Sequence, residues 1–384
     1  MKPSNFYLLS LFILLVSQTF DISTSQGLPE FCNKNDKNTL LRIKNKLGNP
    51  SSLSSWDPNT DCSSWKDVQC GNEQGRVTSI SFIEAQDING PIPPYLDQLP
   101  YLTGLHFINV PNLSGPIPPY IGKLTHLITF TISGTKLTGQ IPPFLGGFTN
   151  LIQLDLSSNK LTGPVPVFLG QLKKLSYLDL SSNELTGSVP SVLAQLTELS
   201  YLQLSSNKLS GRIPDFLSKL KNVNTIDLAS NSLVGRIPEY LGHMPNLTTI
   251  SLSNNLLNGP IPKSLGRSNL AMIKLDHNRL TGDASFLFDK ANMNIVDIHI
   301  DYNFFKFDFS NVDLSRTLVG FNISHNMIYG SLPKRFGELR VEFVDMSYNQ
   351  LCGPIPNGRR FKRVDPAIFS NNKCLCGGPL RACK

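Results

Sequence analysis

The chain has 384 residues, 40% of them hydrophobic and 16% charged, with a net charge of +7 and an isoelectric point near 9.0. Length alone would accommodate two or three domains. The 28 glycines and 27 prolines recur at regular spacing and do not gather in one tract, which excludes a low-complexity or disordered chain.

Residues 1–25 have the pattern of a secretory signal peptide. Lys2 precedes an apolar run from Phe6 to Val16, and small polar residues at Ser23 to Ser25 precede Gln26. The run is shorter than the roughly 20 residues of a membrane span, and no later segment is long and apolar enough for one. The sequence therefore predicts a secreted, extracellular protein with no membrane span.

Residues 26–76 are predicted to form an amino-terminal cap. The segment from Asn35 to Leu47 has the spacing of an amphipathic helix. Its apolar residues are Leu40, Leu41, Ile43 and Leu47. We expect this helix to pack with Trp56 and Trp65 over the first repeat.

Residues 77–356 consist of about twelve copies of one motif, most of them 24 residues long. One copy reads Leu151-Ile-Gln-Leu-Asp-Leu-Ser-Ser-Asn159-Lys-Leu-Thr-Gly163-Pro-Val-Pro166. This motif is a leucine-rich repeat. Two markers give its register: glycine at Gly90, Gly115, Gly139, Gly163, Gly187, Gly211, Gly235, Gly259, Gly282, Gly330 and Gly353, and asparagine at Asn159, Asn183, Asn207, Asn231, Asn255, Asn278, Asn303, Asn326 and Asn349.

Each repeat is predicted to begin with a short strand. Leu154 and Leu156 would point inward, while Gln153, Asp155 and Ser157 face solvent. We expect the asparagine amide to satisfy backbone groups after the strand, and the glycine and Ile-Pro or Val-Pro to turn the chain along the opposite face. Because one repeat buries too little apolar surface to fold alone, the prediction is a single right-handed α/β solenoid with a parallel concave sheet.

All seven cysteines lie outside the repeat interior. Disulfides that close both ends of a solenoid suit an oxidising compartment. Cys374 and Cys376 are closer in sequence than paired zinc ligands usually are, so we predict no metal site. Residues 357–384 are predicted to be a carboxyl-terminal cysteine cap. An odd count leaves one thiol over, or pairs it between molecules; the seven are Cys32, Cys62, Cys70, Cys352, Cys374, Cys376 and Cys383.

These residues resemble the plant polygalacturonase-inhibiting proteins, a family of secreted leucine-rich-repeat proteins. The resemblance spans the mature chain, from Cys32-Asn-Lys-Asn-Asp-Lys-Asn-Thr-Leu-Leu41 to Lys373-Cys-Leu-Cys-Gly-Gly-Pro-Leu380. It implies disulfides that join Cys352 to Cys374 and Cys376 to Cys383. It also implies a location in the plant cell wall or apoplast.

The chain departs from this family at two points. Where the family has adjacent cysteines before Trp65, this chain reads Cys62-Ser63-Ser64-Trp65. Two pairings therefore stay open: Cys32 with Cys62, leaving Cys70 free, or Cys62 with Cys70, leaving Cys32 free. The second departure is length, because the family usually has about ten repeats. An inserted repeat changes register and curvature, so contact residues are not carried over individually.

The solvent-facing strand positions instead define the predicted contact surface. Read down the stack, they form columns in which Tyr177, Tyr201 and Met272 stand on an otherwise polar sheet. Exposed aromatic residues of this kind suit contact with a protein. The predicted contact residues are Gln153, Asp155, Tyr177, Asp179, Tyr201, Gln203, Thr225, Asp227, Thr249, Met272 and Lys274.

Charge is unevenly distributed along the chain. The strand columns are rich in aspartate, which favours a partner with basic patches. Basic residues gather near the carboxyl end and favour retention on an anionic polymer such as pectin. They are Arg335, Arg340, Arg359, Arg360, Lys362 and Arg363. An exported chain without a recognition motif is not expected to bind nucleic acid.

Catalysis is not predicted, and no cofactor is implied. The chain has no G-x-S-x-G, H-E-x-x-H or phosphate-loop motif, and its six histidines lack metal-ligand spacing. Asp276 and Asp301 occupy the same column of adjacent strands, as paired carboxylates of glycosidases can. The same arrangement recurs at Asp155 and Asp179, so repetition alone produces it.

Glycan acceptor sequences begin at Asn112, Asn246 and Asn322. Asn322 lies in the middle column, so a glycan there would leave the early and central repeats for a partner. We therefore predict a secreted plant defence protein that inhibits a pathogen or insect endopolygalacturonase by covering its substrate cleft with the concave face. The alternatives are a peptide-binding or receptor-kinase-binding module in development or signalling, and an ice-binding protein.

Overall fold

The structure is a computed structural model, and it describes residues 31–383 except 72–73, 291–293, 340 and 357–363. The predicted signal peptide and the first residues of the predicted carboxyl-terminal cap lie outside the described residues. Among the described residues, no helix combines the length and the apolar character that a membrane span requires.

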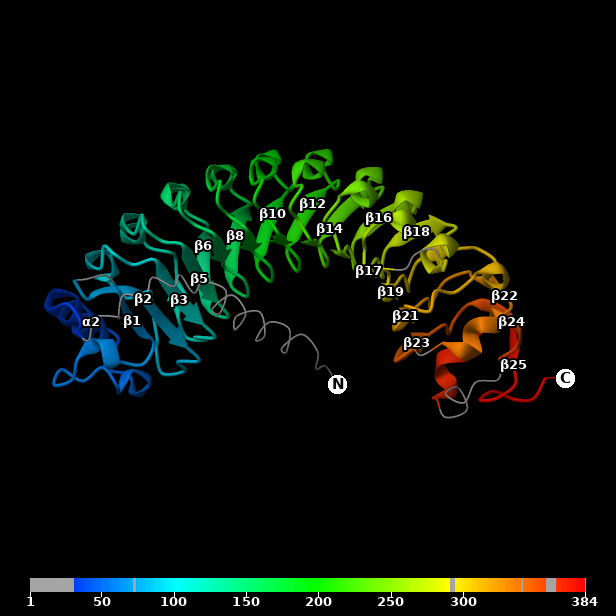
Figure 1. Ribbon diagram of the computed structural model, residues 1–384, viewed down its shortest axis with the longest axis horizontal. Helices are drawn as coiled ribbons and strands as arrows, with labels where there is room; N and C mark the ends of the chain where they lie inside the picture. Colours follow the sequence, from blue (N-terminus) through cyan, green and yellow to red (C-terminus); the bar gives the residue numbers. More distant parts are fainter. Residues whose placement is uncertain (1–30, 72–73, 291–293, 340, 357–363, 384) are drawn as a thin grey trace.

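A thirteen-stranded sheet lines the inner side of an arc, and short helical turns stand on its outer side (Figure 1). β1 (Val68–Gly71) pairs antiparallel with β2 (Arg76–Ile83), and the following strands pair in parallel, one per predicted repeat. They are β3 Gly104–Ile108, β5 Thr129–Ser133, β7 Gln153–Asp155, β9 Tyr177–Asp179, β11 Tyr201–Gln203, β13 Thr225–Asp227, β15 Thr249–Ser251, β17 Met272–Lys274, β19 Asp297–His299, β21 Gly320–Asn322 and β23 Phe343–Asp345. The predicted leucine-rich-repeat solenoid with a parallel concave sheet is confirmed.

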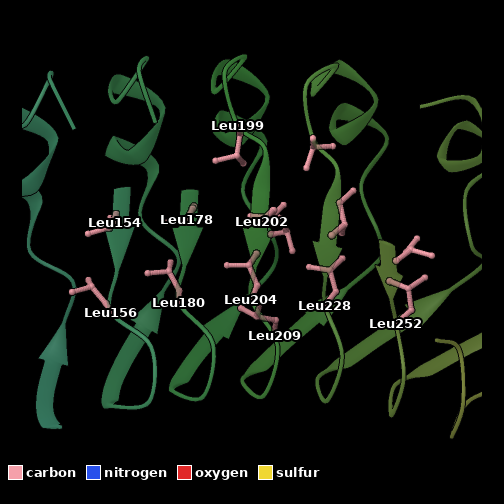
Figure 2. Close-up of a cluster of buried hydrophobic side chains, with 14 of the residues drawn as sticks. Leu154, Leu156, Leu178, Leu180, Leu199, Leu202, Leu204, Leu209, Leu228 and Leu252 are labelled. Carbon is pink, nitrogen blue, oxygen red and sulfur yellow. The ribbon is translucent and has the colours of Figure 1, made fainter. Parts of the chain in front are cut away.

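Inward-facing leucines of successive repeats stack into one continuous core. Leu154, Leu178 and Leu202 form one buried row, with Leu156, Leu180 and Leu204 beneath it (Figure 2). On the outer side, the proline of the Ile-Pro or Val-Pro pair is the N-cap of a 3₁₀ helix in most repeats, as Pro142, Pro166 and Pro190 are. These helices are η3 Leu96–Gln98, η4 Pro119–Lys123, η5 Pro143–Gly147, η6 Val167–Gln171, η7 Ser191–Gln195, η8 Asp215–Lys219, η9 Glu239–His243, η10 Lys263–Arg267, η11 Ser285–Phe288, η12 Phe309–Asn311 and η13 Lys334–Glu338.

The segment that follows the turn after the concave strand forms a second parallel sheet in nine repeats, where the sequence predicted only a turn. Its leucine is buried while the flanking lysine and threonine face solvent, as in β8. The nine strands are β4 Ser114–Gly115, β6 Lys136–Gln140, β8 Lys160–Pro164, β10 Glu184–Gly187, β12 Lys208–Gly211, β14 Ser232–Gly235, β16 Leu256–Pro260, β18 Arg279–Gly282 and β20 Phe304–Phe305. A three-stranded sheet follows, with β22 Tyr329–Gly330, β24 Gln350–Pro354 and β25 Cys374–Cys376.

The repeated asparagines form a hydrogen-bonded ladder through the core. Asn183 Oδ1 accepts from the Leu161 amide of the preceding repeat at 2.9 Å. Its Nδ2 donates back to the Leu156 carbonyl at 2.9 Å, and also to the Leu180 and Ser181 carbonyls of its own repeat. The asparagine ladder comprises Asn159, Asn183, Asn207, Asn231, Asn255, Asn278, Asn303, Asn326, Asn349 and also Asn372, which lies within the predicted carboxyl-terminal cap.

An α-helix, α2 (Lys34–Lys46), covers the amino-terminal end where a helix was predicted. The buried Asp36 carboxylate binds Arg76 through two contacts of 2.8 Å and accepts the Val77 amide, which fixes the helix to β2. Trp56 and Trp65 stack with their ring centroids 5.7 Å apart. Short 3₁₀ turns complete the ends of the solenoid: η1 Ser51–Leu53, η2 Cys62–Ser64 and η15 Pro366–Phe369.

Three disulfides lie at the ends of the solenoid: Cys32 with Cys62, Cys352 with Cys374, and Cys376 with Cys383. Of the two pairings left open at the amino-terminal end, the structure thus has the one that leaves Cys70 free. The Cys70 sulfur lies within 4.8 Å of both partners in the first disulfide. Burial, together with the charges of Asp61 and Asp36, raises the pKa of the Cys70 thiol to about 11.

We predict that Asn183→Ala destabilises the fold by about 2 kcal/mol, because the buried Leu161 amide loses its acceptor and the Leu156, Leu180 and Ser181 carbonyls each lose one of their donors. Urea unfolding monitored by circular dichroism measures the change. Lys160→Ala, an exposed site on the neighbouring β8, is the control and should change stability by less than about 0.5 kcal/mol. Equal losses in the two variants would contradict this role for the ladder.

We predict one titratable thiol per chain, which iodoacetamide alkylates about 100-fold more slowly in the folded chain than in the denatured, unreduced chain. The thiolate is the reactive form, and the raised pKa of Cys70 lowers its population by about two decades. Mass spectrometry of timed samples gives both rates, and Cys70→Ser should remove the signal. Two fast thiols, or none after denaturation, would refute the free Cys70.

Candidate functional site

The strand register places the predicted contact residues in two columns on the concave face. Tyr177 lies between Gln153 and Tyr201, and Asp179 lies between Asp155 and Gln203. The pairing continues in the same register through β13, β15 and β17. The first column therefore holds Gln153, Tyr177, Tyr201, Thr225, Thr249 and Met272, and the middle column holds Asp155, Asp179, Gln203, Asp227, Ser251 and Lys274.

One predicted contact residue is not accessible to a partner. Asp179 is only 4% exposed, whereas the other ten are half-buried. The reason is the neighbouring Tyr177, whose hydroxyl donates to Asp179 Oδ2 at 3.3 Å. The Tyr177 and Tyr201 rings lie 5.8 Å apart and are inclined by 42°. The two tyrosines are thus partly packed against the sheet, and they project less than the sequence predicted.

The aspartates of the middle column have a structural role. Each accepts a hydrogen bond from the amide two residues further on, where the strand ends: Asp155 from Ser157 at 2.9 Å, and Asp179 from Ser181 at 2.8 Å. Asp227 does the same with the Ala229 amide. Asn322 and Asp345 repeat the contact in later repeats. Closure of the turn therefore explains why the acidic residue recurs, independently of any partner.

Asp155 and Asp179 also lie directly opposite each other on β7 and β9. Burial raises the pKa of both carboxyl groups, and the charge of Asp155 raises the pKa of Asp179 further. Burial and the two aspartates likewise hold the pKa of Tyr177 above its ordinary value. The early part of the face consequently carries less negative charge in mildly acidic solution than its composition indicates.

A stack of four rings in the late repeats was not predicted from the sequence. Tyr302 lies between His277 and His325 at 4.3 and 3.9 Å, and His325 stacks on Tyr348 at 4.1 Å. All four residues have positive φ, in the turn three residues after the middle column. Ser158 and its equivalents occupy this turn in the central repeats. The sequence did contain a signal for this stack, because histidine or tyrosine replaces serine at the same position of four consecutive repeats.

The predicted glycan acceptors occupy different environments. Asn246 is exposed, and its amide donates to the Lys221 carbonyl. Asn112 is half-buried and donates to the Gln86 carbonyl. Asn322 is half-buried in the middle column, as predicted from the register. Occupancy of all three remains a prediction.

The concave face is open. Two hollows in the described surface, of about 300 and 400 Å³, contain none of the predicted contact residues. The first is lined by Thr103, His126, Ile128, Asn150, Ile152 and Lys174, and the second by Leu314, Arg316, Arg335, Glu338 and Leu339. The geometry therefore suits contact with a macromolecular surface and gives a small molecule little enclosure.

Comparison with known proteins places this architecture in a family. Residues 149–209 and 221–280 match the leucine rich repeat family, and residues 33–71 match the leucine rich repeat N-terminal domain. The chain is 45% identical to polygalacturonase inhibitor 2 of Arabidopsis thaliana over 379 residues, which cover 98% of this chain and 99% of the relative. It is 40% identical to the polygalacturonase inhibitor of Vitis vinifera over the full length of both chains. The chain belongs to the polygalacturonase-inhibitor family of leucine-rich-repeat proteins.

Solved structures show the same solenoid in proteins of different function. A plant ice-binding protein is 34% identical, with a TM-score of 0.58 over 92% of this chain and 99% of its own. The plant peptide hormone receptor RGFR1, solved in complex with RGF2, is 29% identical, with a TM-score of 0.64 over 74% of this chain and 50% of its own. Membership of the polygalacturonase-inhibitor family therefore carries more functional information than the solenoid does.

We predict that Asp179→Asn stabilises the protein by about 1 kcal/mol at pH 7 and that the gain disappears near pH 4. A carboxyl whose pKa is higher in the folded than in the unfolded chain binds its proton more tightly when folded. Its contribution to the free energy of unfolding thus falls as pH rises from about 4 to about 7. The amide removes this penalty and still accepts the Ser181 amide proton.

Urea unfolding across this pH range measures the effect. Asp227→Asn is the matched control, because Asp227 makes the same turn contact but faces Gln203 and Ser251 in place of a second carboxylate. Because Asp227 lacks a facing carboxylate, Asp227→Asn should not reproduce the gain in stability of Asp179→Asn at pH 7. A loss of stability in Asp179→Asn that is constant with pH would show that the carboxylate itself is required.

Proposed function

We propose that this protein is a secreted plant defence protein that binds a pathogen or insect endopolygalacturonase through its concave face and inhibits it. The observation that carries the proposal is the 45% identity to an Arabidopsis polygalacturonase inhibitor over 98% of the chain. The mechanism is steric. The inner face of the arc covers the substrate cleft of the enzyme, and this chain contributes no catalytic group.

Several features of the structure support this role. The central strands present tyrosine, glutamine, threonine and lysine side chains on a rigid sheet, and aromatic residues are frequent at the centre of protein interfaces. Because the strands are fixed by their neighbours, little conformational entropy is lost when the face binds. Three disulfides are consistent with export to an oxidising compartment such as the cell wall or apoplast.

Pectin remains a proposed secondary partner. Five of the six basic residues predicted to gather near the carboxyl end lie outside the described residues: Arg340, Arg359, Arg360, Lys362 and Arg363. The sixth, Arg335, binds Asp313 at 3.1 Å. Support for pectin binding therefore rests on the net charge of +7.

Two other functions rest on specific resemblances. The likeness to a peptide hormone receptor supports a module that binds a peptide or a receptor kinase. The likeness to a plant ice-binding protein covers nearly all of that chain and supports ice binding. A face that binds ice requires regular rows of similar side chains, but the first column here changes from tyrosine to threonine to methionine between Tyr201 and Met272. The structure therefore supports ice binding less well than inhibition of an endopolygalacturonase.

The direct test is reducing-sugar release from polygalacturonate by a panel of fungal and insect endopolygalacturonases, with and without the purified protein. Dose-dependent loss of activity against any member would support inhibition. No effect across the panel would count against it. Thermal hysteresis, and capture of peptides or receptor ectodomains, then test the other two functions.

We predict that Tyr201→Ala weakens inhibition of a susceptible enzyme by about 10-fold, or about 1.4 kcal/mol. Tyr201 is the better probe of the two tyrosines, because Tyr177 also holds the buried Asp179. Val167→Ala is the control: Val167 is 70% exposed on η6, on the outer side of the arc. Equal inhibition by the wild type and Tyr201→Ala would move the interface away from the central strands.

A further inference from the structure

Two residues after the middle column, the concave face has a third column of side chains. Two adjacent repeats depart from the motif in this third column. This position is occupied by small residues in the central repeats, at Ser157, Ser181, Ser205, Ala229 and Ser253. The next two repeats carry aspartate, Asp276 and Asp301. They follow β17 and β19, which pair directly, so the two carboxylates are neighbours across the sheet.

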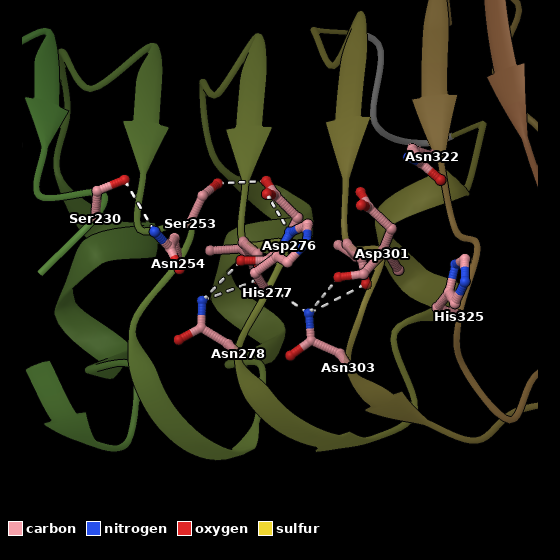
Figure 3. A network of polar contacts seen from close by, with 12 residues as sticks. Ser230, Ser253, Asn254, Asp276, His277, Asn278, Asp301, Asn303, Asn322 and His325 are labelled. Atoms are coloured by element: carbon pink, nitrogen blue, oxygen red, sulfur yellow. Dashed lines mark hydrogen bonds and ion pairs between the residues drawn. The ribbon is translucent and has the colours of Figure 1, made fainter. Parts of the chain in front are cut away.

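A histidine joins this pair. Asp276, His277 and Asp301 each bring one ligand-type atom within 4.8 Å of the other two. His277 Nδ1 lies 3.1 Å from Asp276 Oδ2, and the Ser253 hydroxyl donates to Asp276 Oδ1. Figure 3 shows the Asp276 and Asp301 side chains on neighbouring repeats, with the His277 ring beside Asp276. The His277 ring is also stacked on Tyr302 at 4.3 Å, which limits its rotation.

Asp301 is the unusual member of the group. It is 5% exposed, and among the described residues its Oδ1 atom has no hydrogen-bond partner. A buried carboxylate oxygen that lacks a donor has lost its hydration without compensation. Nor does any of the ion pairs found in the described part of the chain include Asp301. The buried oxygen therefore calls for a positive ligand or a proton.

The repeat architecture does not by itself create this situation. Asp155 and Asp179 are also paired across the sheet, but each accepts the amide at the end of its strand, and Asp179 also binds the Tyr177 hydroxyl. Their histidine-equivalent positions are Ser158 and Ser182. Of the two carboxylate pairs, the later one combines two carboxylates, an imidazole and an oxygen without a hydrogen-bond partner among the described residues.

We propose that Asp276, His277 and Asp301 bind a divalent transition-metal ion such as Zn²⁺ or Mn²⁺. A donor set of two carboxylate oxygens and one imidazole nitrogen suits these ions, whereas Ca²⁺ prefers six to eight oxygen ligands. An ion about 2.0–2.2 Å from each donor requires the three donor atoms to lie within about 4.4 Å of one another, slightly closer than their present limit of 4.8 Å. The half-exposed His277 side leaves the remaining positions to water.

Such an ion would cross-link the turns of two repeats. Its charge would offset both carboxylates and hold His277, the first ring of the His277, Tyr302, His325 and Tyr348 stack, in one orientation. Binding would thus stabilise the late repeats. The proposal does not depend on inhibition of an endopolygalacturonase.

The test is isothermal titration calorimetry of the full secreted chain with ZnCl₂ and MnCl₂, with CaCl₂ as the comparison. We expect one ion per chain for the wild type, and affinity weakened about 10-fold or more in Asp301→Asn and in His277→Ala. Asp179→Asn, which alters the other carboxylate pair in the sheet, should bind like the wild type. His277→Ala alters an exposed side chain, so it remains informative if Asp301→Asn fails to fold.

Thermal unfolding supplies a second readout. At the same ion concentration, the ion should raise the melting temperature of the wild type and of Asp179→Asn more than those of Asp301→Asn and His277→Ala. Undetectable binding of all three ions at millimolar concentration would overturn the site. Unchanged affinity in Asp301→Asn and His277→Ala would do the same, because the ion would then bind elsewhere. Preferential binding of Ca²⁺ would overturn the assignment to transition metals.

Discussion

Stacking of the repeats depends on the asparagine ladder, because it satisfies backbone groups that two neighbouring sheets leave unpaired. Each asparagine accepts one amide from the preceding repeat and donates both to that repeat and to its own, as Asn183 does with Leu161, Leu156 and Leu180. A buried amide or carbonyl without a partner is costly, so the ladder allows the chain to leave the concave sheet inside the core. The same contacts fix the offset between repeats, which in turn aligns the strand residues in columns.

Because the columns are fixed, residues with a structural role on the concave face lie in one column and residues that could contact a partner lie in another. In the middle column, the carboxylates of Asp155, Asp179 and Asp227 each accept a backbone amide at the end of the strand. One oxygen of each side chain is therefore already hydrogen-bonded within the protein. The first column has no such repeated backbone contact. Recognition of a partner by this face should therefore depend mainly on the first column, where side chains vary from repeat to repeat. Because the aspartates of the middle column close turns, their recurrence does not imply that the partner is basic.

The period of the sequence was sufficient to predict the strands, their register, the inward leucines and the use of the asparagine amide. It was insufficient where the structure depends on contacts between neighbouring repeats or on departures from the motif. Lys160 to Pro164 reads as a turn, because its single buried leucine is a weak strand pattern, yet parallel neighbours complete a second sheet. Asp179 was predicted to face solvent like the equivalent aspartates, but it is buried because the neighbouring Tyr177 covers it and donates to its carboxylate. Asn372 extends the ladder beyond the last full motif. It keeps the spacing of the preceding asparagines, but Ala367, Phe369 and Cys374 stand where the motif has leucines, so the leucine pattern no longer marked a repeat.

The two carboxylate pairs show how position within one repeat determines what a charge does. In the middle column an aspartate faces the amide that ends its own strand, so a neighbouring aspartate adds repulsion to a group that is already hydrogen-bonded. Two residues later, at Asp276 and Asp301, the side chain directly precedes the residue of positive φ and does not accept the equivalent amide. Asp276 obtains one from Ser253 and Asp301 has none for Oδ1 among the described residues. An aspartate in the middle column thus closes a turn. A pair of aspartates in the third column instead leaves a buried carboxylate oxygen without a donor among the described residues, which is the geometry from which we propose a cation site.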